Sequence, residues 1–149
     1  MSTPEQTPFT LLLVEDEPAD AHLIEIAFRE GQAVLDLQHV EDGVEALRYL
    51  RREGAYAEAP RPDLILLDLN MPRMDGRRFL EEQKRDDALR AIPVVVLTTS
   101  EAEADILSAY DLGAAGYIVK PFDFADFLEV ARKLEDYWVT LIRRPPVDG

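Results

Sequence analysis

Length, composition and charge already restrict the class of protein. The chain has 149 residues, 47% of them hydrophobic, so it is long enough to fold as one domain without disulfides or a structural metal. It contains no cysteine, which excludes disulfide frameworks, thiolate zinc sites, iron–sulfur clusters and cysteine nucleophiles. Its formal net charge of −14 disfavours binding to nucleic acid and to anionic membranes.

No apolar run is long enough to span a bilayer, and the N-terminus lacks the positive charge and apolar stretch of a signal peptide. We therefore expect a cytoplasmic protein. Residues 1–9 are typical of a flexible tail, and residues 143–149 form a second tail. Between them we expect one domain over residues 10–142.

Short apolar runs alternate along the chain with amphipathic segments. Four runs have the near-continuous apolar character of strands buried on both faces, and they predict strands over 10–14, 64–67, 93–97 and 115–119. A weaker apolar pattern predicts a strand over 34–40. Apolar residues at helical spacing predict helices over 19–30, from Gly43 to Leu50, around Phe79 and Leu80, and over 101–112 and 123–142. Five strands separated by helices predict an α/β fold, a doubly wound (βα)5 unit with a parallel five-stranded sheet.

Polar residues follow four of these strands at the point where each ends. In doubly wound sheets, binding sites lie beyond the carboxyl ends of the strands. The residues at those ends are Glu15 and Asp16, Asp68, Thr98 and Lys120. Each alone has an ordinary structural role as a helix cap, a turn residue or a surface charge. Because four strand ends bring them to one edge, we expect them to form a common site.

The charges at this edge favour a particular chemistry. Carboxylates about 4 Å apart repel by about 4 kcal/mol at an effective dielectric constant near 20, so three of them need a nearby cation to stay ionised. Oxygen ligands without histidine or cysteine suit Mg²⁺. The ammonium of Lys120 suits a phosphoryl group. Together these groups indicate phosphoryl transfer onto an aspartate.

Four segments carry a resemblance to a known family. They read LLLVEDEP at 11–18, LILLDLNMPRMDG at 64–76, PVVVLTTS at 93–100 and GYIVKPF at 116–122. In this order, over roughly residues 10–137, the sequence resembles the CheY-like receiver domain of two-component response regulators. The resemblance implies the strand order 2-1-3-4-5.

The resemblance also implies roles for individual residues. Asp68 would accept a phosphoryl group from a sensor histidine kinase, and Lys120 would pair with the phosphoryl oxygens. Mg²⁺ would be bound by Glu15, Asp16, Asp68 and the backbone carbonyl of Asn70.

A conformational switch is implied as well. Thr98 would move its hydroxyl toward the phosphoryl group and Tyr117 would turn inward, while a cis peptide bond would join Lys120 to Pro121. Phosphorylation adds nearly two negative charges at one strand end. That charge would shift a two-state surface formed by the fourth helix, the fifth strand and the fifth helix.

The C-terminal part of the sequence indicates how the protein would pass on its signal. The short segment after Phe122 has room for one helix and a tail, so we expect a stand-alone receiver that signals by protein contact or onward phosphoryl transfer. Apolar residues continue late in the last helix, at Tyr137, Trp138, Leu141 and Ile142. Two interpretations remain open for them: they fold back on their own domain, or they form a homodimer surface together with the fourth helix, fifth strand and fifth helix.

The long last helix, the loop at 51–62 and the Thr98-Thr99-Ser100 sequence resemble regulators that partner phytochrome-type histidine kinases such as bacteriophytochromes. We expect a phosphorylated switch, not an enzyme that turns over repeatedly. The alternative is a pseudo-receiver, a binding module that is never phosphorylated; it predicts a missing site residue, and none is missing. A haloacid-dehalogenase-type phosphatase needs a second aspartate where Asn70 stands, and a flavodoxin-like carrier needs a phosphate-binding loop where Glu15 to Glu17 stand.

Overall fold

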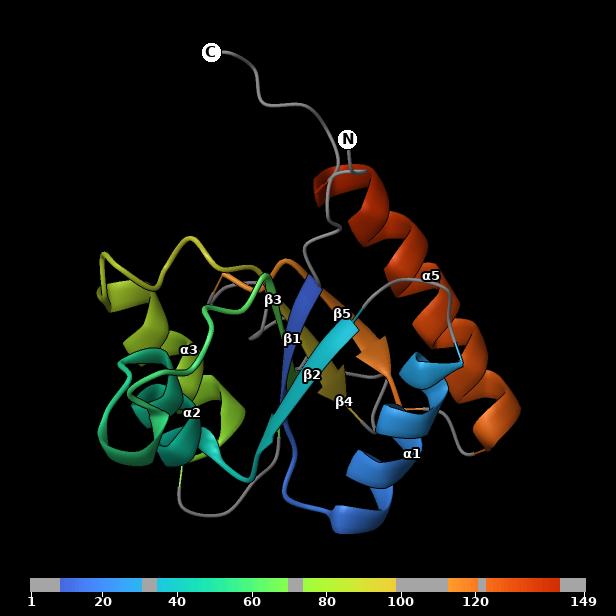
Figure 1. Ribbon diagram of the computed structural model, residues 1–149, viewed down its shortest axis with the longest axis horizontal. Helices are drawn as coiled ribbons and strands as arrows, with labels where there is room; N and C mark the ends of the chain where they lie inside the picture. The colour runs from blue at the N-terminus through green and yellow to red at the C-terminus, as the bar shows by residue number, and fades with distance from the viewer. Residues whose placement is uncertain (1–8, 31–34, 70–73, 99–112, 121–122, 143–149) are drawn as a thin grey trace, which may run out of the picture.

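The computed structural model of the chain describes residues 9–30, 35–69, 74–98, 113–120 and 123–142, and of Thr98 and residues 137–142 only the backbone. Five parallel strands form one sheet in the order β2-β1-β3-β4-β5 (Figure 1). The predicted α/β fold and strand order are therefore confirmed. The strands are β1 (Phe9–Val14), β2 (Leu35–Val40), β3 (Leu64–Asp68), β4 (Val94–Thr98) and β5 (Gly116–Val119).

Helices cover both faces of this sheet. Most boundaries lie within one residue of those predicted, and both β1 and α1 begin one residue earlier than expected. The predicted helix over 101–112 lies outside the described residues. The same is true of the predicted C-terminal tail and of the N-terminal tail up to residue 8. The described helices are α1 (Pro18–Arg29), α2 (Gly43–Leu50), a short 3₁₀ turn η1 (Gly54–Tyr56), α3 (Gly76–Arg85) and α5 (Phe124–Ile142).

The alternation of side chains along β1 divides the core into two layers. Leu12 and Val14 face α2 and α3, while Leu11 and Leu13 face α1 and α5 (Figure 1). All four are fully buried, which explains why the strand reads as a continuous apolar run. Burial of such side chains stabilises the fold by about 1.5–3 kcal/mol each.

Because the sheet is parallel, β1, β3, β4 and β5 all end at the same edge. The turn that leads into α1 starts there, with Glu17 as N-cap and Pro18 at the first helical position, where its missing N–H costs little. This edge is where the candidate site lies. Among the described helices, none has the length and apolar character required to cross a membrane.

Candidate functional site

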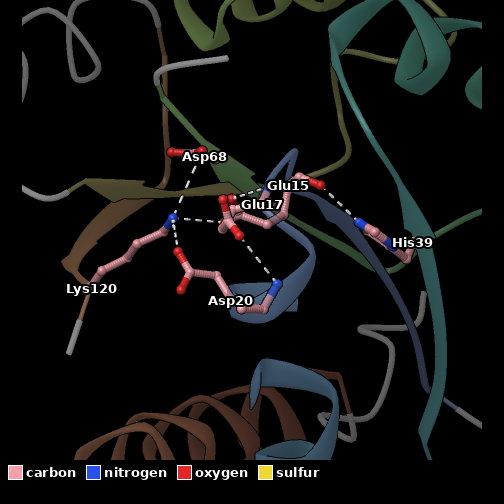
Figure 2. Close-up of polar contacts among 7 residues, drawn as sticks. Glu15, Glu17, Asp20, His39, Asp68 and Lys120 are labelled. Carbon is pink, nitrogen blue, oxygen red and sulfur yellow. Dashed lines mark hydrogen bonds and ion pairs between the residues drawn. The ribbon is translucent and has the colours of Figure 1, made fainter. Parts of the chain in front are cut away.

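Charged side chains from distant parts of the chain meet at this edge of the sheet (Figure 2). Glu15 and Asp16 follow β1, Asp68 is the last residue of β3, and Lys120 follows β5. The strand β4 lies between β3 and β5, so Lys120 reaches across it with its long aliphatic stem. Of the residues predicted from the sequence, the structure thus brings these four together.

Three of the carboxylates form a tight group. Glu15, Asp16 and Asp68 each place an oxygen within 4.8 Å of the others. Glu15 is fully buried and Asp68 is 6% exposed, while Asp16 faces solvent. At this spacing, ionised carboxylates repel by about 3 kcal/mol per pair at an effective dielectric constant near 20. The group therefore requires positive charge beside it.

The donor set of this group fits a hard divalent cation. All three ligand groups are carboxylates, and Asp16 is open to the water molecules that Mg²⁺ keeps in its coordination shell. Glu15 Oε2 accepts a hydrogen bond from the amide of Glu17 at 3.1 Å. Glu15 Oε1 is buried and lies 2.8 Å from Lys120 Nζ, and a carboxylate oxygen has a second lone pair that could bind a cation. The residues therefore suit a bound Mg²⁺.

Lys120 supplies the positive charge that the described structure places among these acids. Its Nζ lies 2.8 Å from Glu15 Oε1 and 3.8 Å from Asp68 Oδ2, and its side chain is only 10% exposed. Burial alone would lower the pKa of Lys120, but its contacts with Glu15, Asp20 and Asp68 outweigh that cost and raise the pKa above its usual value. The ammonium is therefore charged at neutral pH, close to the Asp68 carboxylate.

Asp20 is a member of this cluster that the sequence analysis did not predict. Its Oδ2 accepts a hydrogen bond from Lys120 Nζ at 2.9 Å (Figure 2). Asp20 is the third residue of α1, which starts at the carboxyl end of β1. That position was the available signal, because the first turn of such a helix lies beside the strand ends.

His39 is a second residue that was not predicted. Its Nε2 donates a hydrogen bond to the backbone carbonyl of Glu15 at 2.8 Å (Figure 2). The Glu15 amide in turn donates to the carbonyl of Val40 at 3.1 Å. Two residues at the end of β2 therefore hold the backbone of Glu15, and the position of His39 next to the end of its strand was the signal for it.

Two glycines determine how the segment after Asp68 packs. A Cβ on Gly76 would lie 2.8 Å from Leu69 Cα and 3.0 Å from the carbonyl oxygen of Asp68. A Cβ on Gly43 would lie 2.8 Å from Met74, whose carbonyl accepts a hydrogen bond from the Gly43 amide. Because only glycine fits at such distances, the N-terminus of α3 packs directly against the chain at Asp68 and Leu69, and that of α2 packs against Met74.

The structure describes the remaining predicted site residues only in part. Tyr117 lies on β5, the outermost strand, and is 40% exposed. Thr98 ends β4 as predicted, but its hydroxyl lies outside what is described. Asn70 and Pro121 also lie outside the described residues, so the carbonyl ligand and the cis peptide bond stay predictions. The same holds for the side chains of the proposed dimer residues Tyr137, Trp138, Leu141 and Ile142.

Comparison with known proteins agrees with this geometry. The family model of the response regulator receiver domain matches residues 11–132. Response regulator Rcp1 of Synechocystis sp. is 38% identical over 145 residues, which are 97% of this chain and 99% of Rcp1.

Solved structures give the same result. The phosphorylated cyanobacterial phytochrome response regulator RcpA has a TM-score of 0.84 and 44% identity, over 91% of this chain and 96% of RcpA. The Mn²⁺-bound form of Rcp1 has a TM-score of 0.78 and 37% identity, over 93% of this chain and 100% of the Rcp1 chain. Since the family model and these relatives span most of the chain, the protein belongs to the response regulator receiver domain family.

Proposed function

We propose that this receiver accepts a phosphoryl group on Asp68 from a histidine kinase, in a step that depends on Mg²⁺. One observation carries the proposal: a buried ammonium, that of Lys120, lies 3.8 Å from the Asp68 carboxylate within a group of acids. A phosphoryl group bound to Asp68 would carry its charge beside that ammonium. Electrostatic stabilisation of this kind is the main requirement of phosphoryl transfer.

In the proposed reaction, a carboxylate oxygen of Asp68 forms a bond to phosphorus while the bond between phosphorus and the donor's imidazole nitrogen breaks. The imidazole leaves with the electron pair, and Asp68 becomes an acyl phosphate. The receiver itself is regenerated by hydrolysis, so it acts as a switch and not as an enzyme with many turnovers.

Glu15, Asp16 and Asp68 would hold the metal, together with the Asn70 carbonyl implied by the family. The metal would neutralise charge on the transferring phosphoryl group. A divalent cation is also present in the Mn²⁺-bound form of Rcp1. The oxygen donors of this chain suit Mg²⁺ on chemical grounds, because carboxylates and retained waters are its usual ligands.

The proposed partner is a phytochrome-type histidine kinase, since RcpA is a phytochrome response regulator and is 44% identical to this chain. The cytoplasmic location expected from the sequence belongs to the same proposal. Output would be a protein contact: the acyl phosphate would draw Thr98 and then Tyr117 inward. Tyr117 lies on β5 and is 40% exposed, so its movement would change the surface that we propose for a homodimer.

Intact-mass measurement tests the phosphorylation. Wild-type protein incubated with Mg²⁺ and acetyl phosphate should gain the mass of one phosphoryl group, and EDTA should prevent it. Asp68→Asn should show no gain. Asp87→Asn is the matched control, because that aspartate side chain is 91% exposed and pairs only with Arg90 among the contacts shown. No mass gain in the wild type, or a gain that persists in Asp68→Asn, would contradict the proposal.

Phosphotransfer kinetics test the partner. Radiolabelled phosphoryl groups should pass from a phytochrome-type kinase to this receiver at a higher initial rate than from histidine kinases of other sensory classes. Equal rates across these kinases would count against the phytochrome assignment and leave the phosphorylation itself unaffected.

A further inference from the structure

Lys120 makes two short contacts with carboxylates. Its Nζ donates a hydrogen bond to Asp20 Oδ2 at 2.9 Å, across 100 residues of sequence. At 2.8 Å it also forms an ion pair with Glu15 Oε1. The Asp68 carboxylate, at 3.8 Å, is beyond hydrogen-bond distance. Asp20 and Glu15 therefore make the two short contacts with this ammonium.

Asp20 and Glu15 also differ in what else they can bind. Glu15 belongs to the group of three carboxylates that suits a divalent cation, and Asp20 does not. A cation bound by Glu15 would weaken the attraction between Glu15 and Lys120. The contact with Asp20 would remain, because its carboxylate lies outside the group. Asp20 is thus placed to keep the ammonium at the site when a cation is present.

The lysine needs such a contact for a physical reason. A lysine side chain has about 2 kcal/mol of rotamer entropy, and its four-carbon stem has many conformations. Here the stem also has to reach across β4. Asp20 sits in the first turn of α1, two residues after Pro18, so its own backbone is well fixed. A hydrogen bond from a fixed element selects one conformation of the mobile side chain, which preorganises it for reaction.

We propose that Asp20 is a positioning residue that holds the Lys120 ammonium beside Asp68 for the incoming phosphoryl group. The inference rests on the proposed function, since it assigns Asp20 to the same reaction. Asp20 does not touch the phosphoryl group; it acts through Lys120. Another role for an acidic residue in this position is stabilisation of the helix N-terminus through the helix dipole, and the test has to separate the two roles.

The first part of the test is kinetic. Phosphorylation by acetyl phosphate is followed by mass at saturating Mg²⁺. Asp20→Ala should lower the rate about tenfold, and Asp20→Asn, which keeps a neutral acceptor, should lower it less. Glu17→Gln removes one negative charge at the same helix end without a contact to Lys120, so it should stay within about twofold of the wild type.

The second part shows whether Asp20 acts through Lys120. In a Lys120→Ala background, where the residual rate is low, adding Asp20→Ala should cause no further loss. In EDTA, Asp20→Ala should lower the urea midpoint of unfolding in the wild-type background and leave it unchanged in the Lys120→Ala background. This second measurement requires neither metal nor phosphodonor.

Each outcome decides between the proposals. If Asp20→Ala is phosphorylated at the wild-type rate, or loses as much activity with Lys120→Ala as without it, the inference about Asp20 is wrong and the proposed function stands. If Glu17→Gln loses as much as Asp20→Ala, the effect belongs to the helix end and the inference is again wrong. If the wild type gains no phosphoryl group, the proposed function and the inference fail together.

Discussion

Replacement of Lys120 by methionine removes the ammonium from the acidic cluster and keeps a side chain of similar length. In the wild type, Nζ lies 2.8 Å from Glu15, 2.9 Å from Asp20 and 3.8 Å from Asp68. At an effective dielectric constant near 20, these distances correspond to attractions of about 4–6 kcal/mol each. The cost of desolvating the charges cancels much of this attraction.

What remains is the penalty for leaving buried carboxylates without a counter-charge. Glu15 is fully buried and Asp68 nearly so. Removing one partner of a buried ion pair costs about 3–5 kcal/mol. We expect Lys120→Met to lower the free energy of unfolding by that amount at pH 7. Because folding raises the pKa of Lys120, its contribution is fully present below the unfolded-state value of 10.5 and is lost only as the pH rises through the folded-state value.

Urea unfolding followed by circular dichroism measures this loss, in EDTA and again in Mg²⁺. Mg²⁺ should restore more stability to Lys120→Met than to the wild type, because the cation replaces the missing positive charge. Lys133→Met removes a charge from an exposed site on α5 and serves as the control. If Lys120→Met unfolds within about 1 kcal/mol of Lys133→Met in EDTA, the ammonium does not neutralise the cluster and the reasoning is refuted.

Three further substitutions test the support around the site and the core, each by urea unfolding. Gly76→Ala should lower the free energy of unfolding by about 1–3 kcal/mol, because the added Cβ would lie 2.8 Å from Leu69 Cα. The substitution should also slow phosphorylation, and a variant as stable as the wild type would contradict the close packing. Gln83→Ala should lower the free energy of unfolding by about 2–4 kcal/mol, because the buried amide donates hydrogen bonds to two backbone carbonyls at 2.7 and 3.0 Å. A loss below about 1 kcal/mol would show that water takes the place of the amide. Tyr49→Phe should cost about 1 kcal/mol through loss of the 2.8 Å hydrogen bond to the carbonyl of Pro60. Burial raises the pKa of Tyr49 to about 12, so wild-type stability should fall between pH 10 and 12 more steeply than that of Tyr49→Phe, and parallel curves would refute this.

The sequence by itself determined the architecture and most of the site. Apolar runs such as Leu64 to Leu67 are so short and continuous that only strands buried on both faces accommodate them. Once the sheet is known to be parallel, every residue that follows such a run is brought to the same edge. For that reason Glu15, Asp68 and Lys120 could be placed together before any distance was known.

Packing decided what a linear pattern does not contain. Gln83 occupies a position in α3 that looks like any polar residue of a helix, yet it is fully buried and caps two carbonyls of the following loop. The loop after α2 reads as polar and irregular, but the Tyr56 ring lies tilted against the Tyr49 ring, with 5.4 Å between ring centroids, and its hydroxyl donates a hydrogen bond to Glu45. Contacts of this kind depend on the angle at which one element meets another.

The same holds at the site. Asp20 and Lys120 are 100 residues apart and meet only because α1 starts beside the edge to which Lys120 reaches across β4. His39 reaches the Glu15 carbonyl because β2 ends beside β1 in register. Residue types and their order along the chain were sufficient to find the carboxylates. Which side chains hold them in place depends on the direction and reach of each side chain, and those exist only in the folded molecule.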